Sequence, residues 1–426
     1  MTATTPGVDV PRLQRRTIRL LATTQILGGV GVAMGVSVGS LLLYHLTGGP
    51  SLSGFGQAMS VIGGALVAIP VVRVTNLYGR RPGLALAYAT GIVGALVLVA
   101  AIVAGSAPLA FVGMFFFGGG TAANLQARYA ATDLAEPARR GRQLSMIVWA
   151  TTVGAVAGPL LMPKADGFIR GVLNAPQYVG PFVVSAIGFV LAGVVLWFLL
   201  RPDPLLVARR VADAPEMVKS ERGLGAGCRA VRGIGVARRG LTAVALGQLV
   251  RVGVMVMTPV HIQDTMEGHA HAGHPGSGWT VEGVVGVIIS LHIAGMYAFS
   301  PIVGWAADRF GRRAVILSGI VLLIAACATA GTAGDGTPQL AAGLVLLGLG
   351  WSCTMVAGSA LLTESVDVAR RASAQALSDV TMGVAGAAAG ALSGVVMDAA
   401  GYPILALCAA VTTVPVVVAA LRARRR

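Results

Sequence analysis

The amino-acid sequence predicts an all-α membrane protein with twelve transmembrane helices in two pseudo-symmetric six-helix bundles. Three observations favour this fold class. The 426 residues are 55% hydrophobic and only 12% charged, whereas soluble domains carry about 25% charged residues. Apolar runs of about 18 residues or more, each long enough to cross a bilayer as a helix, recur along the chain. Two short motifs of the first half also return in the second half.

Twelve apolar runs are assigned as membrane spans. In the first half they cover 20–44, 53–72, 83–104, 108–130, 143–163 and 179–200, and in the second half 240–262, 281–303, 313–331, 338–361, 374–397 and 402–421. The first run is too long for the apolar part of a signal peptide, so it is read as a span. The predicted organisation is therefore an N-terminal six-helix bundle over 1–200, a cytoplasmic linker over 201–239 and a C-terminal bundle over 240–426.

The basic residues predict the orientation of the chain. The net charge is +15, and the arginines gather almost wholly in alternate connections, which is the pattern of cytoplasmic loops. We therefore expect a multi-pass protein of the cytoplasmic (inner) membrane, surrounded by the lipid bilayer, with both termini in the cytoplasm. No basic folded domain with interleaved aromatic residues occurs, so a nucleic-acid partner is not expected. We expect a monomer without a cofactor.

The repeated motifs relate the two halves. "GWAADRFGRR" at 304–313 matches "VRVTNLYGRR" at 72–81, and "TDLAEPARRGRQLS" from Thr132 matches "TESVDVARRASAQA" from Thr363 at nearly the same separation. In the second pair, Asp133 aligns with Glu364 and Arg140 with Arg371. A duplicated unit whose copies are related by an axis along the membrane normal is typical of transporters that rock around a central site.

The first of these motifs resembles the loop signature G-x-x-x-D-R-x-G-R-R of the major facilitator superfamily. The residues that match its loop 8–9 form are Gly304, Asp308, Arg309, Gly311, Arg312 and Arg313, and those that match its loop 2–3 form are Gly79, Arg80 and Arg81. With the spans and the linker, the resemblance covers nearly the whole chain and is closest to the 12-span drug:proton antiporter branch. It implies the fold and transport, but it does not identify a substrate.

The resemblance implies a gate. In this superfamily the loop carboxylate latches one bundle to the other on the cytoplasmic side, so Asp308 would meet the start of span 5, near Gly141 and Arg142. The alternative is that the charges only set topology, which explains the arginines but not the carboxylate. Because Asn76 stands where the first half would carry the acid, we expect an asymmetric gate that depends on Asp308.

Span 5 contains a second resemblance. Gly154, Gly158 and Pro159 match the G-x-x-x-G-P motif of superfamily exporters that exchange substrate for protons. The alternative is ordinary tight packing, because small residues let helix backbones approach closely. In span 4, Met114 stands where proton-coupled members carry an arginine, so coupling would have to use other residues.

Polar residues within the spans are candidates for substrate and proton binding, because charged groups at this depth are costly and usually face a cavity. Gln248, Arg251 and Met255 in span 7 and His292 in span 8 are the substrate-binding candidates. A buried structural hydrogen-bond network is the alternative. Asp379 in span 11 is the candidate for proton coupling, unless it only faces cytoplasmic water at the helix start.

A histidine-rich segment, "HIQDTMEGHAHAGH", is placed in the outer connection between spans 7 and 8. Its histidines are His261, His269, His271 and His274, with Asp264 and Glu267 among them. Imidazoles and carboxylates at this density can bind transition metals, although no fixed four-ligand spacing is evident and incidental binding is the alternative.

These features predict a secondary active transporter rather than an enzyme, since neither an ATP-binding loop nor a nucleophile elbow occurs. The first hypothesis is proton-coupled export of small amphipathic or drug-like molecules by alternating access. The alternatives are an uptake symporter or organic-anion carrier, which Arg251 would favour, a divalent-metal exporter that uses the histidine-rich segment, and a non-transporting sensor on the same fold.

Overall fold

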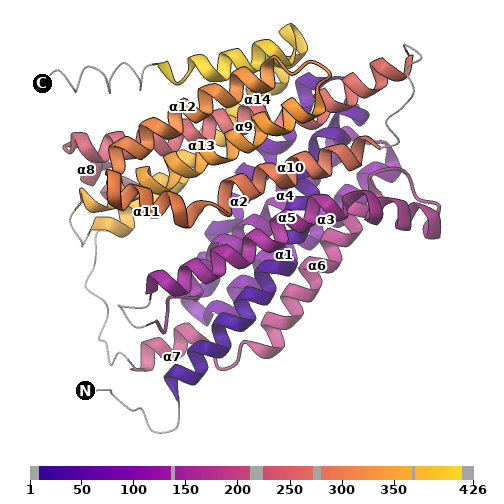
Figure 1. The fold of residues 1–426 in the computed structure, drawn as a ribbon. Helices are drawn as coiled ribbons and strands as arrows, with labels where there is room; N and C mark the ends of the chain where they lie inside the picture. The colour runs from indigo at the N-terminus through magenta and orange to yellow at the C-terminus, as the bar shows by residue number, and fades with distance from the viewer. Residues whose placement is uncertain (1–8, 136–139, 212–223, 272–279, 367–369, 415–426) are drawn as a thin grey trace, which may run out of the picture. The chain divides into compact units, whose positions relative to one another are not determined.

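The computed structural model describes residues 9–135, 140–211, 224–271, 280–366 and 370–414. These residues form helices joined by short connections, and no strand occurs among them. The chain divides into two compact units (Figure 1), one made of Met1–Leu42 and Met59–Met217 and the other of Leu43–Ala58 and Val218–Arg426. The end of the first helix and the start of the second therefore belong to the second unit.

The helices of the first half are α1 (Val10–Thr47), α2 (Pro50–Tyr78), α3 (Arg80–Ala104), α4 (Ala107–Ala130), α5 (Arg140–Leu173), α6 (Val179–Leu199) and α7 (Pro204–Val211). Those of the second half are α8 (Leu224–Arg232), α9 (Gly235–His271), α10 (Val281–Tyr297), α11 (Ser300–Phe310), α12 (Arg312–Gly331), α13 (Thr337–Glu364) and α14 (Arg371–Val411).

Ten segments of the described chain are long and apolar enough to cross a membrane. Helices α10 and α11 count together as one of them, and α5 is not among the ten. Helix α14 counts once, although it covers the spans predicted at 374–397 and 402–421; it is broken between them at Gly401, whose φ is 78°. The all-α membrane fold is confirmed, whereas the count of twelve spans stays a prediction.

Several helices extend past the apolar runs that predicted them. Helix α1 begins at Val10 rather than near residue 20, and α9 continues to His271 rather than ending near residue 262. No glycine or proline interrupts residues 12–27 or 260–267, so nothing in the local chemistry stops either helix where the apolar run stops. The first histidines of the predicted outer connection are therefore helical.

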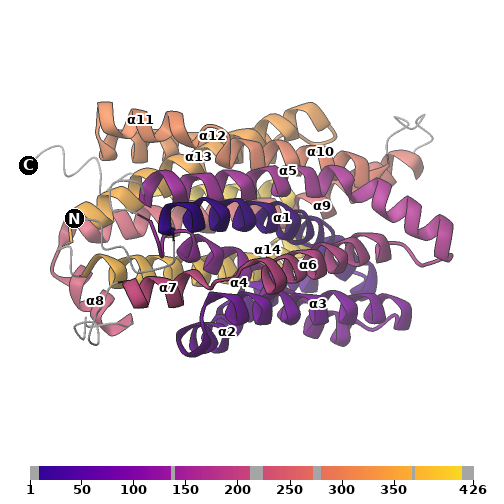
Figure 2. The ribbon, with the colours of Figure 1, turned by 90° about the horizontal axis from the view of Figure 1, so that it is seen from below.

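The first unit is built around an aromatic core. Tyr88 of α3, Phe117 of α4 and Phe189 of α6 are fully buried, and the ring centroids of Phe117 and Phe189 lie 5.4 Å apart. Helix α3 packs against both α4 and α6 (Figure 2). A Cβ added to Gly94 of α3 would overlap the backbone of Phe117. The close α3–α4 contact therefore depends on a residue without a side chain.

In the second unit, α13 is a central helix. It packs against α9, α10 and α12, while α9 also packs against α14 (Figure 1). A Cβ added to Gly348 of α13 would overlap the carbonyl oxygen of His292 in α10, so these two helices also meet through backbone contact. This packing brings the polar residues of α9 next to α13.

Candidate functional site: repeated ion pairs and a polar cluster

Arg80 opens α3 and forms a two-pronged ion pair with Asp133, which follows α4. Its Nε lies 2.7 Å from one carboxylate oxygen and its Nη2 lies 2.9 Å from the other. Only 14% of the Arg80 side chain and 9% of the Asp133 side chain are exposed. Such bidentate, charge-assisted bonds are the strong class of hydrogen bond. The pair therefore ties the end of α4 to the start of α3.

The charge of Asp133 is influenced by two opposing effects. Burial raises the pKa of this carboxyl, and the hydrogen bond and positive charge of Arg80 lower it. Burial is the larger effect, so the pKa of Asp133 lies above its usual value of 3.8. A carboxyl in this position accepts a proton more readily than one in water.

Arg312, the repeat counterpart of Arg80, forms the matching pair in the second half. Its Nη2 lies 2.8 Å from Glu364, the counterpart of Asp133, and its Nη1 lies 2.5 Å from Asp308. This second cluster is more open, because 54% of the Glu364 side chain and 72% of the Asp308 side chain are exposed. The sequence repeat thus produces the same contact in both units, enclosed in one and exposed in the other.

The remaining residues of the repeated motifs differ in their contacts and in their exposure. Arg81 lies over the ring of Trp197 in α6, 4.7 Å from its centroid. Arg309 and Arg313 are exposed, and Gly304 is partly buried. Gly311 ends α11 and begins α12 at a φ of 89°, which favours glycine. The side chains of Arg140, Arg142 and Arg371 lie outside the described residues, so the predicted latch between Asp308 and the start of span 5 stays a prediction.

A carboxylate from the predicted linker occupies the loop 2–3 motif. Asp203, just before α7, accepts hydrogen bonds from the backbone N–H of Arg81 at 2.8 Å and from that of Leu205 at 3.0 Å. Arg209 of α7 donates to the backbone carbonyl of Asn76 at 2.9 Å. An acid is thus present at the N-terminus of α3 even though Asn76 is neutral, and it stabilises that end of the helix.

The span-5 motif packs against α1. Cβ atoms added to Gly154 and Gly158 would overlap the carbonyl oxygens of Ile26 and Val30, respectively. Pro159 lies inside α5 without ending it. The two glycines therefore allow direct backbone contact between two helices of the first unit.

The substrate-binding candidates of α9 form one cluster with Trp351 of α13. Trp351 donates its indole N–H to Gln248 Oε1 at 2.8 Å, and Arg251 Nε donates to the same oxygen at 3.3 Å. The Arg251 guanidinium lies 5.7 Å from the centroid of the Trp351 ring and 3.9 Å from the sulfur of Met255. The structure therefore brings Gln248, Arg251 and Met255 together.

His292 has a separate set of contacts. Its ring is fully buried, and Nδ1 lies 2.8 Å from the carbonyl oxygen of Leu344 in α13, while Nε2 has no hydrogen-bond partner. Asp379 lies near the start of α14 and is exposed. The charge of Arg251 acts on the His292 ring, so His292 lies near the Arg251 cluster.

The metal-binding candidates are only partly described. His261 stacks on Tyr402 with ring centroids 4.2 Å apart. Asp264 accepts a hydrogen bond from Tyr44 at 2.8 Å, and Glu267 accepts one from Gln263 at 2.8 Å. The side chains of His269 and His271, and all of His274, lie outside the described residues. Within the described part of the chain, no group of three potential ligands is close enough to hold a metal ion.

Comparison with known proteins identifies the family. The family model of the Major Facilitator Superfamily matches residues 20–281 and 277–426. The chain is also 38% identical over 410 residues to the uncharacterized MFS-type transporter YdeG of Bacillus subtilis (strain 168), a match that covers 95% of this chain and 92% of that protein. The chain belongs to the major facilitator superfamily. It is therefore a multi-pass membrane transporter of small molecules, and not an enzyme.

Two further similarities agree with this assignment. The chain is 27% identical over 370 residues to the riboflavin transporter RfnT of Brucella anthropi (strain ATCC 49188), covering 86% of this chain and 85% of that one. A crystal structure of the nucleoside transporter NupG superposes with a TM-score of 0.71 at 16% identity, over 96% of this chain and 98% of that one. The second similarity shows the fold alone.

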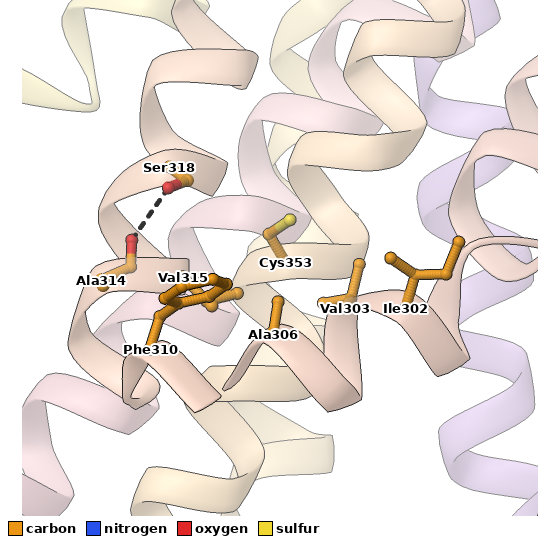
Figure 3. Close-up of a pocket in the computed structure, with 8 residues that line it drawn as sticks. All are labelled: Ile302, Val303, Ala306, Phe310, Ala314, Val315, Ser318 and Cys353. Carbon is orange, nitrogen blue, oxygen red and sulfur yellow. Dashed lines mark hydrogen bonds between the residues drawn. The ribbon is translucent and has the colours of Figure 1, made fainter. Parts of the chain in front are cut away.

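This superfamily transporter also has an apolar groove between α11, α12 and α13 (Figure 3). Its lining residues are Ile302, Val303, Ala306, Phe310, Ala314, Val315, Ser318 and Cys353. The one hydroxyl, that of Ser318, donates to the carbonyl of Ala314 at 3.0 Å. Binding pockets normally combine apolar walls with polar groups that orient the ligand. Because this groove offers few such groups, the Arg251 cluster is the better candidate for substrate.

Sequence reasoning missed two residues of the superfamily transporter that the structure makes prominent. Trp351 is one of five tryptophans and lies in a predicted span, but it belongs to none of the repeated motifs. Asp203 lies in the predicted linker over 201–239. Its signal was the Asp-Pro pair at 203–204, since aspartate before a proline is typical of a helix start.

Proposed function

We propose that this transporter is a secondary active exporter that moves small amphipathic or drug-like molecules out of the cell in exchange for protons, by alternating access. The observation that carries the proposal is the repeated ion pair, Arg80 with Asp133 in one unit and Arg312 with Glu364 in the other. Alternating access needs contacts that hold some loops in place and contacts that open and close, and these two pairs occupy equivalent loops of the two units.

The difference between the two pairs supports a division of roles. An exposed ion pair contributes little to stability, about 0–1 kcal/mol, so the Arg312 cluster can open at low cost. An enclosed pair is much more costly to separate, so the Arg80 pair would hold its loop in place. Asp308, which contacts Arg312, would then be the movable part of the gate.

The direction of transport and the coupling ion are inferred from further residues. Export is supported by the resemblance of Gly154, Gly158 and Pro159 to the motif of exporting members. Asp379 is our candidate for proton exchange, because it is a carboxylic acid on a membrane-spanning helix and is not buried among the neighbouring helices.

The placement of basic residues supports an orientation. The arginines of alternate connections would face the cytoplasm, which puts both termini there and the chain in the cytoplasmic membrane. We expect it to act as a monomer, since each repeated ion pair is complete within one chain.

Transport by purified protein in liposomes tests this proposal. A panel of toxic cationic, neutral and anionic compounds is offered with and without an imposed pH gradient, and internal pH is followed with a trapped dye. We expect at least one compound to move only with the gradient and to move protons in return. Asp379→Asn should abolish the coupled proton movement, while Asp9→Asn, which changes an exposed acid at the start of the chain, should not. Movement of every compound regardless of the gradient would contradict the proposal.

A second measurement tests the direction in cells. Cells that express the wild type should survive higher concentrations of a transported toxic compound than cells that express Asp308→Asn at the same level. Greater sensitivity of the wild-type cells would instead indicate uptake.

A further inference from the structure

The polar cluster of the second unit contains the cation Arg251, which no carboxylate of the described residues contacts. Arg251 is partly buried within α9, and its described contacts are with Gln248, Met255 and the face of Trp351. Among the described residues, no carboxylate contacts its guanidinium. A charged group in a membrane span is costly and is normally paired. This arginine therefore has unused capacity to bind an anion.

The hydrogen-bond donors of the cluster have a defined orientation. An indole nitrogen can only donate, so the bond from Trp351 fixes the oxygen of the Gln248 amide toward α13. Arg251 Nε bonds the same oxygen, which leaves the Gln248 amide nitrogen and Arg251 Nη2 as donors without a described partner. A carboxylate can accept a hydrogen bond from each of these two groups.

The space beside the Gln248 amide is kept open by a glycine. A Cβ added to Gly386 of α14 would lie 3.1 Å from Gln248 Nε2, closer than ordinary side-chain contacts. Any larger residue there would press on the amide nitrogen. The lack of a side chain at Gly386 therefore leaves room next to one of the two unused donors.

Aromatic rings adjoin the same donors. Trp351 is nearly buried, and the ring of Tyr297 in α10 meets it edge to face with centroids 5.7 Å apart. Aromatic ligands favour such edge and face contacts. An amphipathic substrate with a ring next to its charged group would match the combination of donors and rings, whereas an aliphatic ion would use only the donors.

We propose that Arg251 and Gln248 bind the carboxylate of an aromatic organic acid whose ring packs against Trp351 and Tyr297. The inference rests on the proposed function, since it names a chemical class among the small amphipathic molecules that the chain would transport. Arg251 is the residue that selects for the negative charge, and Trp351 is the residue that selects for the ring.

Matched acids and amides test the inference by direct binding. The full chain in lipid nanodiscs is titrated with benzoate, 2-naphthoate and 2-anthroate, with the carboxamide of each, and with cyclohexanecarboxylate. We expect at least one aromatic acid to bind about tenfold or more tightly than its amide, which corresponds to about 1.4 kcal/mol, and more tightly than cyclohexanecarboxylate. If no aromatic acid binds, or if acid and amide bind equally in all three pairs, the inference is wrong.

Substitutions test whether the preferences for a carboxylate and for an aromatic ring arise from Arg251 and Trp351. Arg251→Gln should reduce the acid-to-amide preference to below about twofold, and Arg251→Lys should keep part of it, because lysine retains the charge but lacks the planar fork of donors. Trp351→Leu should reduce the preference for aromatic over aliphatic acid. The matched control is Arg239→Gln, the same substitution at an exposed arginine of the same helix, which should leave both preferences unchanged. An acid preference that survives in Arg251→Gln would overturn the assignment.

The two proposals fail in different ways. If gradient-driven transport of neutral compounds occurs but no acid preference is found, only the substrate class is wrong. If aromatic acids bind through Arg251 but no compound exchanges for protons, the transport proposal is wrong and the binding site stands.

Discussion

Arg80 and Arg312 occupy equivalent positions but have different surroundings. Arg80 and Asp133 are both largely enclosed, so removal of either would leave a buried charge alone. Arg312 shares its charge with Asp308 and Glu364 in water. The repeat thus provides two versions of one contact, and they differ both in burial and in the number of carboxylates that the arginine contacts.

We expect Arg80→Met to destabilise the protein far more than Arg312→Met. Breaking a buried pair by removing one partner costs about 3–5 kcal/mol, whereas loss of an exposed pair costs about 0–1 kcal/mol. Thermal unfolding of the two variants and the wild type in the same nanodiscs measures the difference. Equal losses would contradict this view of the enclosed pair.

The pKa of Asp133 predicts a pH dependence. Because burial raises that pKa above 3.8 in the folded protein, the folded state holds this proton more tightly than the unfolded state. The contribution of Asp133 to stability is therefore fully present below its ordinary pKa and is lost as pH rises through the raised pKa. The melting temperature of the wild type relative to Asp133→Asn should fall as the pH is raised from about 4 toward neutral. A relative rise over that interval would reverse the sign and contradict the prediction.

At the scale of elements, α7 and the residue before it contact the junction between α2 and α3. Gly79 joins those two helices at a φ of 103°, a conformation that favours glycine. A Cβ at Gly79 would also overlap the Asp203 carboxylate, whereas one at its repeat counterpart Gly311 would meet nothing within 4 Å. Both glycines therefore have a backbone conformation that favours glycine, and only Gly79 also lacks room for a side chain.

Gly79→Ala should consequently be more destabilising than Gly311→Ala. Both substitutions incur about 1–3 kcal/mol for a positive-φ backbone that is sparsely populated by residues other than glycine, and Gly79→Ala also displaces Asp203 from the N-terminus of α3. Unfolding measurements on both variants and on Gly79→Ala combined with Asp203→Ala provide the comparison. The second substitution should recover part of the loss at Gly79, and strict additivity would show that Asp203 is not the obstacle.

The sequence predicted the helices well and their contacts only in part. Apolar runs predicted the helices because backbone groups inside a bilayer must form their hydrogen bonds within the helix. They did not predict the start of α1 or the end of α9, because both helices continue beyond the apolar run. The repeat aligned Arg80 with Arg312 and Asp133 with Glu364, yet only the packing of α3 on α4 joins Arg80 to Asp133. Trp351 and Asp203 act through contacts 103 and 122 positions away in the chain, which no local pattern reveals.

At the scale of the whole molecule, the proposed gate should be asymmetric. The second half places Asp308 on Arg312, whereas the first half has Asn76 in that position, where its described contact is a backbone carbonyl bonded to Arg209. A side chain that takes no part in an ion pair has little to lose when it is shortened.

Asp308→Asn should therefore reduce transport severalfold, while Asn76→Ala should leave it close to the wild-type rate. Initial rates in liposomes, normalised to the amount of inserted protein, provide the measurement. Equal and small losses from both variants would show that the two loops do not differ in this way.

The attachment of α7 also has a consequence for how the halves are joined. Asp203 and Arg209 bind α7 to the first unit, and Ala230 and Val231 of α8 pack with Leu362 of the second unit. Two separately synthesised polypeptides, one ending after Val211 and the other beginning before Leu224, would therefore each retain the contacts that attach α7 or α8 to its own unit.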